Sequence, residues 1–274
     1  MSYLTALLLG LVQGLAEFLP ISSSGHLAVF QNVFHVEGAD LFFDVLLHFG
    51  TLIAIFAAYW KEIVELIQAF FGFFRKDQSP EAVRAAMPNR RMILLIIVAT
   101  LPLVLVLPIK DKLESLYNNL VFIGFALIVT GLILFFGDRV RRGKKTERDA
   151  TLLDAVLVGL GQALAVVPGL SRSGTTISAG MVRGFDREFA VRFSFILSIP
   201  AVLGANLLSL VDAIKEGVNW SLMPKYLLGV IVAMVSGYAA ISFLKYITRK
   251  SKFGVFAYYC WGAGLVTLIL SMVS

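Results

Sequence analysis

The chain is poor in charged residues, which make up 15% of its 274 positions, whereas 58% of its residues are hydrophobic. This balance excludes an ordinary soluble core and is typical of a protein that crosses a membrane several times. The chain also has only one cysteine and three histidines. A single cysteine excludes a disulfide framework, and the lack of a Cys/His cluster argues against structural zinc.

The N-terminal stretch lacks the features of a cleavable signal peptide. Residues 1–19 contain no basic segment, and no A-x-A cleavage pattern follows them. The net charge of +6 does not indicate a nucleic-acid partner, because the basic residues cluster in short loops beside apolar segments. Membrane topology alone accounts for that distribution.

The first apolar segment, residues 4–19, is too short for a comfortable span, and Pro20 ends it. A polar stretch follows at residues 21–26, and a second short apolar arm covers residues 27–34. Two short apolar arms around a polar break predict a re-entrant hairpin, which enters and leaves the membrane on the same side.

The rest of the first half is predicted to hold three full spans, at residues 41–60, 92–108 and 120–136. Residues 61–74 have apolar side chains at the helical period, so we expect an amphipathic helix along the membrane interface. Residues 77–91 are predicted to form a polar loop that contains proline.

The second half has the same outline. Apolar arms at residues 152–167 and 177–182 flank a polar break, and spans are predicted at residues 189–211, 226–247 and 253–273. With an offset of 149 residues, the two hairpins share the order of Gly, Gln, Leu, Ala, Ser, Ser and Gly; the matches pair Gly10, Gln13, Leu15, Ala16, Ser22, Ser24 and Gly25 with Gly159, Gln162, Leu164, Ala165, Ser171, Ser173 and Gly174. The alternative is a chance likeness of two apolar, glycine-rich stretches.

The counts of Lys and Arg predict the topology. Nineteen of them fall in four connections that would share one face of the membrane, and four fall on the other face. The richer side is expected to be cytoplasmic. Three spans separate the hairpins, so the sequence predicts an all-α polytopic membrane protein built as an inverted repeat: repeat one at residues 1–136, a basic cytoplasmic loop at 137–149 and repeat two at 150–274, in a single membrane domain.

Arg172 is the one basic residue that does not fall at a predicted membrane edge. It lies in the stretch PGLSRSGTT, residues 168–176, where proline and two glycines break the helix and hydroxyl groups surround the guanidinium. An ionisable residue at membrane depth indicates a functional site, and Arg beside Ser, Thr and a helix N-terminus is suited to phosphate. The simpler alternative is a kinked helix with a snorkelling arginine.

The first hairpin tip is predicted to meet the second near mid-membrane, where inverted-repeat proteins place their sites. It contributes Gln13, Glu17, His26 and the serines at 22–24. A carboxylate beside phosphate usually holds Mg²⁺ or Ca²⁺, and histidine can serve as acid, base or activator of serine. The set therefore predicts metal-assisted phosphoryl transfer.

Each of these residues also has a structural alternative. Glu17 could be a buried carboxylate paired with Arg172, Gln13 could bond across helices, and His26 could be a satisfied core histidine. Asp44 and His48, one helical turn apart, could form a structural polar pair.

The two tips together resemble the motifs of bacterial undecaprenyl-diphosphate phosphatases, also called bacitracin-resistance proteins. Residues 13–26 read QGLAEFLPISSSGH, residues 168–176 read PGLSRSGTT, and the likeness extends to RGFDRE at 183–188 and over essentially the whole chain. Many members have Glu where this chain has Gln13, which makes Gln13 a weaker candidate metal ligand than Glu17.

The resemblance implies an enzyme of the bacterial inner membrane that removes the terminal phosphate of undecaprenyl diphosphate. It implies a divalent cation, Mg²⁺ or Ca²⁺, held by Glu17 with Gln13. It also gives catalytic roles to His26, Ser23 and Arg172. The diphosphate would be bound by Arg172 with four hydroxyl residues, Ser22, Ser171, Ser173 and Thr176. Whether serine or water is the nucleophile stays open.

The resemblance also implies that the enzyme recycles the lipid carrier for peptidoglycan synthesis and lowers sensitivity to bacitracin. We further expect its active site to open to the periplasm. The partners are the lipid substrate and membrane lipid, with no nucleic acid, and a homodimer is an open expectation. A polyprenyl-phosphate flippase or transporter would share the inverted-repeat outline. It would not need an acid/base and a nucleophile beside Arg172.

Overall fold

The computed structural model describes residues 1–33, 40–75, 79–250 and 253–272, and every regular element within them is a helix, apart from one isolated backbone bridge. Among these residues five helical segments are long and apolar enough to cross a membrane. They are α3 (Leu41–Ala58), α5 (Pro80–Thr100) with η1 (Leu101–Ile109), α7 (Leu120–Arg139), α10 (Arg187–Glu216) and α11 (Met223–Arg249), the last preceded by η3 (Trp220–Leu222). Three shorter apolar helices are α1 (Tyr3–Phe18), α8 (Leu152–Leu164) and α12 (Val255–Leu270). The prediction of an all-α polytopic membrane protein is confirmed.

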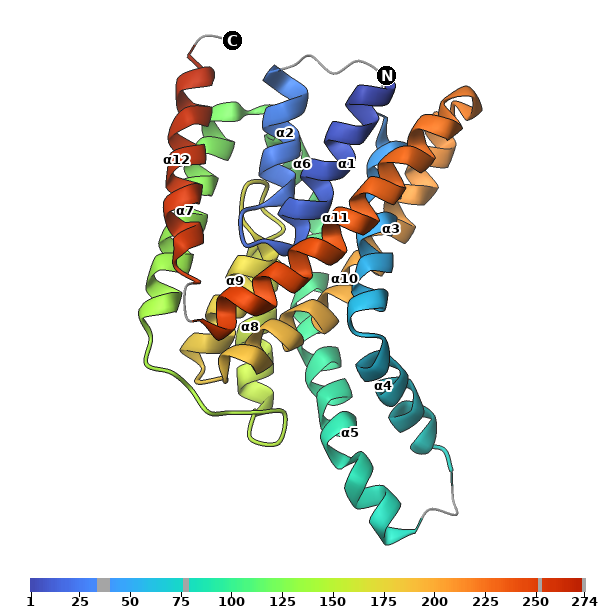
Figure 1. Ribbon diagram of the computed structural model, residues 1–274, viewed down its shortest axis with the longest axis vertical. Helices are drawn as coiled ribbons and strands as arrows, with labels where there is room; N and C mark the ends of the chain where they lie inside the picture. The colour runs from blue at the N-terminus through green and yellow to red at the C-terminus, as the bar shows by residue number, and fades with distance from the viewer. Residues whose placement is uncertain (34–39, 76–78, 251–252, 273–274) are drawn as a thin grey trace.

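Two helical hairpins enter the bundle from opposite ends, and their tips lie in its middle (Figure 1). The first joins α1 to α2 (Ser23–Val33), and the second joins α8 to α9 (Arg172–Val182). Leu19 precedes Pro20 and has extended backbone, with φ −65° and ψ 142°, so α1 ends there. At the second tip, Gly169 follows Pro168 with φ +87°, and an added Cβ would lie 2.6 Å from the Cβ of Ala126. Only glycine fits this turn.

The hairpins are held by close packing of small residues. Gly10 on α1 lies against Gly229 on α11, where an added Cβ would come within 2.5 Å of the carbonyl oxygen. Gly159 on α8 lies in the same way against Ala99 on α5, at 2.4 Å. Small residues let helix backbones approach closely in membranes. Since the internal alignment pairs Gly10 with Gly159, this packing supports the inverted repeat, which stays a prediction.

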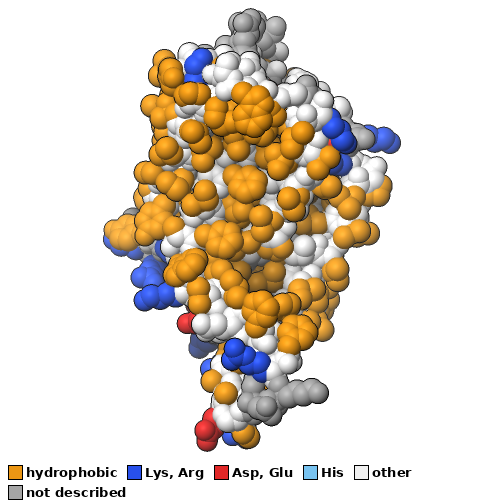
Figure 2. Space-filling model, turned by 90° about the vertical axis from the view of Figure 1, so that its right-hand side faces the viewer, with side chains coloured by type: hydrophobic (Ala, Val, Ile, Leu, Met, Phe, Trp, Pro, Cys, Tyr) orange, Lys and Arg blue, Asp and Glu red, His pale blue; other side chains and the backbone are white. Residues whose placement is uncertain are grey.

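The predicted division of Lys and Arg between the two ends of the bundle stays a prediction, and the positions of the connections bear on it. The α7–α8 and α9–α10 connections lie toward the lower part of Figure 1, whereas both chain termini lie at the top. Figure 2 shows hydrophobic side chains over the middle of one face, with Lys and Arg gathered toward its margins. The apolar middle matches a membrane-facing belt.

One predicted loop is a helix. Residues 77–91 were expected to be a polar loop, but α5 begins at Pro80, after Ser79 accepts a hydrogen bond from the backbone N–H of Ala82 at 3.2 Å. Proline is favoured in the first turn of a helix, so Pro80 is compatible with the start of α5 and does not indicate a loop. The connection at residues 109–119 also contains helical turns, α6 (Lys110–Glu114) and η2 (Ser115–Asn118).

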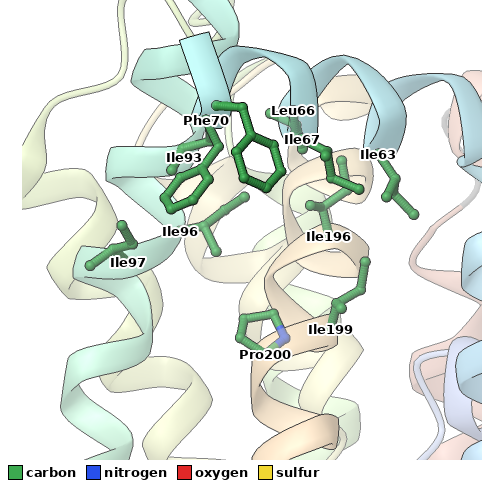
Figure 3. A pocket seen from close by; sticks show the side chains of 11 residues that line it. Ile63, Leu66, Ile67, Phe70, Ile93, Ile96, Ile97, Ile196, Ile199 and Pro200 are labelled. Carbon is green, nitrogen blue, oxygen red and sulfur yellow. The ribbon is translucent and has the colours of Figure 1, made fainter. Parts of the chain in front are cut away.

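The amphipathic segment forms α4 (Trp60–Gly72), which pairs with α5 as a hairpin below the bundle in Figure 1. An apolar pocket of about 260 Å³ lies between α4, α5 and α10 (Figure 3). Its lining is entirely Ile, Leu, Phe and Pro, including Ile63, Phe70, Ile97 and Pro200. It offers no donor or charge to a phosphate, so the polar chemistry of the molecule lies elsewhere.

Candidate active site

The two hairpin tips touch through polar contacts. The hydroxyl of Ser24 accepts a hydrogen bond from the backbone N–H of Gly169 at 3.3 Å. In the opposite direction, Ser173 donates its hydroxyl to the carbonyl oxygen of Leu19 at 3.3 Å. Residues about 150 positions apart in sequence therefore form one site, as the sequence predicted.

Glu17 is the centre of this site and is only 7% exposed. Its Oε1 forms an ion pair with Nη2 of Arg172. Its Oε2 accepts hydrogen bonds from the Ser23 hydroxyl at 2.7 Å and from Nε2 of Gln13 at 3.1 Å. Nε2 of His48, on α3, lies 4.0 Å from the same oxygen. Four of these five side chains were predicted for the site, and the ion pair is the one that the sequence offered as a structural alternative for Glu17.

Local structure explains why these side chains converge. Gln13 and Glu17 are one helical turn apart, so both leave the same face of α1. Arg172 is the first residue of α9, and Ser171 caps that helix by accepting from the backbone N–H of Gly174 at 3.1 Å. The positive end of the α9 dipole and the guanidinium thus point to the same junction, which favours an anion there.

Two buried polar atoms at the junction have no hydrogen-bond partner in the described part of the chain. One is Nη1 of Arg172, a donor, and the other is Oε1 of Gln13, an acceptor. Unpartnered buried atoms are costly, and in native proteins they call for an explanation such as a ligand or ion. A site that binds an anion together with a cation would satisfy both atoms.

His26 belongs to the first tip, where two contacts hold its ring, and its predicted catalytic role stays a prediction. Its Nδ1 lies 2.8 Å from the backbone oxygen of Ser22, and its Nε2 lies 2.8 Å from the Tyr259 hydroxyl on α12. The two rings also stack, with centroids 5.6 Å apart. The hydroxyl of Ser23 is hydrogen-bonded to Glu17, so the carboxylate and not the imidazole is the nearest base to that serine.

Ser22 shapes the first tip. It has φ +71°, the left-handed region that non-glycine residues seldom adopt. Its hydroxyl accepts from the backbone N–H of Gly25 at 3.2 Å and so caps α2. Strained backbone of this kind is found at functional sites, where the surrounding structure holds it in place.

The hydroxyl groups of the second tip bond mainly within the protein. Thr176 donates to the carbonyl oxygen of Arg172 at 2.8 Å and contacts the hydroxyl of Ser194 at 2.5 Å. The Ser171 and Ser173 hydroxyls lie 3.3 Å from each other. In this arrangement they hold the shape of the loop, and their predicted role in binding diphosphate stays a prediction.

Sequence reasoning missed three residues around the site. Thr130 on α7 donates to the carbonyl oxygen of Gly169 at 3.0 Å and accepts from the N–H of Ser171 at 3.1 Å, and so holds the second tip. Tyr259 orients His26. His48 was considered only as a partner of Asp44, yet it bonds the backbone oxygen of Asp44 and faces Glu17. The only sequence signal for His48 was its spacing of one helical turn from Asp44 within α3.

Comparison with known proteins agrees with this geometry. The sequence model of the family described as "Bacitracin resistance protein BacA" matches residues 6–266. The chain belongs to this family. It is 41% identical over 275 residues to a protein of Alkaliphilus metalliredigens, with all of both chains covered. It is 42% identical over 274 residues to one of Carboxydothermus hydrogenoformans, with 98% of each covered, and both relatives are named undecaprenyl-diphosphatase.

A divalent cation fits the residues of this bacitracin resistance family member. Hard cations bind oxygen ligands. Glu17 supplies a carboxylate, and Gln13, whose Nε2 donates to that carboxylate here, would supply its unpartnered Oε1 after rotation of the amide. In the described ranges no cluster of three His, Cys, Asp or Glu side chains is present. Water or oxygens of a bound phosphate group would therefore complete such a site, as is usual for Mg²⁺.

Proposed function

We propose that this chain hydrolyses undecaprenyl diphosphate to undecaprenyl phosphate and inorganic phosphate. The observation that carries the proposal is the junction of Ser23, Glu17 and Arg172 inside a bundle of apolar helices. It combines a hydroxyl, a carboxylate and a guanidinium, which are the groups that phosphoryl transfer needs. The names of the relatives, which match along the full length, support the same activity.

The position of the site suits a substrate that stays in the bilayer. Each CH₂ group that a prenyl tail withdrew from lipid would cost about 0.8 kcal/mol. An enzyme for such a substrate must therefore bring its polar groups to the headgroup. The two hairpins do this by breaking at Pro20 and Pro168 and presenting their tips to each other.

Arg172 is proposed to hold the diphosphate. Its Nη2 is fixed by Glu17, and its buried Nη1 remains available to donate to a phosphate oxygen. A guanidinium held in this way is preorganised, so it stabilises the charge that grows on the transferred phosphoryl group.

Ser23 is proposed as the nucleophile of the first step. Its hydroxyl proton already points to Glu17, at 2.7 Å. As the oxygen of Ser23 bonds to the terminal phosphorus, the proton moves to Glu17 and the bridging P–O bond breaks. Undecaprenyl phosphate leaves with the electron pair of that bond.

In the second step a water molecule attacks the phosphoserine. The P–O bond to Ser23 breaks, inorganic phosphate leaves, and Ser23 takes back the proton that Glu17 accepted in the first step. His26 is proposed to accept the proton of that water, with Tyr259 and Ser22 fixing the orientation of its ring. Direct attack by water on the substrate, with His26 as base, is the alternative route.

Glu17 and Gln13 are proposed to hold a divalent cation, Mg²⁺ or Ca²⁺. When bound, the cation would neutralise diphosphate charge and polarise the reacting P–O bonds. The Ser171, Ser173, Thr176 and Ser22 side chains are proposed to line the phosphate site around it.

We also propose the setting of the reaction. The protein would lie in the bacterial inner membrane with its Lys/Arg-rich end in the cytoplasm, so that the first hairpin opens to the periplasm. Its product would return to the lipid-carrier pool for peptidoglycan, which lowers sensitivity to bacitracin. Formation of a homodimer by two copies of this chain is also proposed.

The deciding experiment is phosphate release from undecaprenyl diphosphate by the detergent-purified protein, with and without EDTA. We expect release that EDTA abolishes and added Mg²⁺ or Ca²⁺ restores. A flippase built on the same repeat would move labelled lipid between vesicle leaflets without releasing phosphate, and that result would overturn the proposal.

A further inference from the structure

We infer that His48 is a third protein ligand of the cation held by Glu17 and Gln13. The inference deepens the proposed function, since it concerns the same site and rests on a cation being used there. It goes beyond the two motif regions, because His48 lies on α3, outside both hairpins.

The first observation is the spacing of the ligand atoms. Nε2 of His48 lies 4.0 Å from Oε2 of Glu17, which is too long for a hydrogen bond. Neighbouring ligands of one ion, each about 2.0–2.5 Å from it, are separated by about 3–4 Å. The distance between Nε2 of His48 and Oε2 of Glu17 is therefore suited to two ligand atoms of one ion.

The second observation is how the imidazole is held. Nδ1 of His48 lies 2.8 Å from the backbone carbonyl oxygen of Asp44, one turn earlier on α3. A carbonyl only accepts, so Nδ1 carries the hydrogen and Nε2 keeps its lone pair. Histidines that bind metals almost always donate their other N–H to a carboxylate, carbonyl or water. His48 is thus already oriented as a ligand, with its lone pair on the side of Glu17.

The third observation is the unpartnered oxygen of Gln13. The amide now donates through Nε2 to Oε2 of Glu17 at 3.1 Å, while its buried Oε1 bonds to nothing in the described chain. Rotation of the amide by half a turn exchanges the two atoms. Oε1 would then lie about 3 Å from the carboxylate, a spacing suited to two oxygens on one ion.

The mixed ligand set has a consequence for the choice of metal. Carboxylate and amide oxygens suit Mg²⁺, Ca²⁺ and Mn²⁺, whereas imidazole favours transition metals. A site with one nitrogen and two oxygens should therefore prefer Mn²⁺ to Ca²⁺, and this preference should depend on His48.

The test is Mn²⁺ binding by purified protein without substrate, followed by the loss of the free-ion signal in electron paramagnetic resonance. We expect His48→Ala to weaken Mn²⁺ binding at least tenfold while changing Ca²⁺ binding, measured by competition, much less. His48→Gln keeps an amide group near the position of Nε2. Its affinity for Mn²⁺ should therefore lie between that of the parent and that of His48→Ala. His26→Ala is the matched control, because His26 faces Tyr259, and it should bind Mn²⁺ like the parent.

A second readout locates the ion. Fe²⁺ with ascorbate and peroxide cleaves backbone close to where it binds, so fragments should end near residues 17 and 48 and should diminish in His48→Ala. Thermal unfolding of each variant without metal checks that the fold is retained.

The inference is overturned if the parent binds no Mn²⁺ at millimolar concentration, or if His48→Ala and His48→Gln both bind it as the parent does. Mn²⁺ binding that depends on His48, in a protein that releases no phosphate, would instead overturn the proposed function and leave the ligand assignment standing.

Discussion

At the scale of single residues, Glu17 must satisfy several partners with two oxygens. One oxygen is paired with Arg172, and the other accepts from Ser23 and Gln13. Removing one member of a buried charge pair leaves the other uncompensated, which is strongly destabilising. Substitutions of Glu17 are therefore expected to lower both activity and stability. A substitution of Arg172 that keeps the positive charge should lower activity while largely keeping stability, so it separates the two effects.

We predict that Arg172→Lys loses at least about a hundredfold in turnover, nearly as much as Arg172→Ala. Lysine keeps the charge but cannot hold Glu17 and a phosphate oxygen at once with a planar fork. Losing one preorganised donor of this kind typically costs about 3–4 kcal/mol in the transition state. The measurement is phosphate release by purified variants.

The thermal unfolding temperature of each variant is the control for this prediction. Arg172→Lys should stay close to the parent, because Pro168 and Gly169 set the path of the loop. More than about a third of parent activity in Arg172→Lys would contradict the role of the fork.

At the scale of secondary-structure elements, the position of α1 depends on glycine contacts with α11. An added Cβ at Gly14 would lie 2.0 Å from the Ser236 hydroxyl oxygen and 2.5 Å from the carbonyl oxygen of Ala233. The carbonyl belongs to the backbone, so it cannot move aside by changing a rotamer. Gly14 lies between Gln13 and Glu17, so any shift of α1 also moves the site.

We predict that Gly14→Ala destabilises the protein by about 1–3 kcal/mol, as overpacking typically does. The matched control is Gly262→Ala on α12, where nothing lies within 4 Å of the added atom. The control should lose no stability, since alanine favours helix by up to about 1 kcal/mol over glycine. Equal thermal unfolding temperatures for the two variants would show that the α1–α11 contact is looser than described.

An ionic cluster ties together the outer ends of the second hairpin. Buried Asp154, at the start of α8, accepts from Nζ of Lys145 at 2.9 Å and from Nε of Arg183 at 2.8 Å. Burial by itself would raise the pKa of Asp154, but hydrogen bonds from Thr151, Lys145 and Arg183 together lower that pKa from 3.8 to about 2. The carboxylate is therefore more acidic in the folded protein than in the unfolded chain.

This pKa shift predicts a pH dependence of stability. A lowered folded-state pKa means that the ionised Asp154 stabilises the fold above about pH 3.8 and that this contribution is lost as the pH falls toward 2. Asp154→Asn should thus be less stable than the parent at pH 7, by about 1–3 kcal/mol. The difference in unfolding temperature should shrink as the pH approaches 3; a constant difference would contradict the assignment.

At the scale of the whole molecule, the charge distribution predicts an orientation that can be measured. Lys144, in the α7–α8 connection, and Lys215, near the C-terminal end of α10, are both exposed, and these two segments lie at opposite ends of the bundle in Figure 1; native Cys260 is buried. In spheroplasts an impermeant maleimide should label Lys215→Cys and should label Lys144→Cys only after lysis. The reverse pattern would invert the topology.

Much of the fold followed from sequence patterns with a direct physical cause. Pro20 and Pro168 marked the two hairpin tips, and apolar length marked the spans. The helix at residues 80–91 was missed because Pro80 and Pro88 were read as breakers, although proline at a helix start is favourable.

The site was predictable where residues lay close together in sequence. Glu17 and Arg172 were placed at one junction because both hairpins had a polar tip at matching positions. His48 and Tyr259 were not, because they come from α3 and α12, and no spacing within one segment shows how helices pack. The loop without Lys or Arg that the sequence predicts at residues 35–40 lies outside the described residues, apart from Asp40.

The ion pair at the centre of the site also bears on how the protein is made. Arg172 follows Glu17 by 155 residues, so a ribosome synthesises the first hairpin long before the partner of its carboxylate exists. Until α9 is inserted, Glu17 is a carboxyl group at membrane depth without its counter-ion, which favours a protonated side chain or one that faces water. Assembly of the second hairpin is then the event that charges the site.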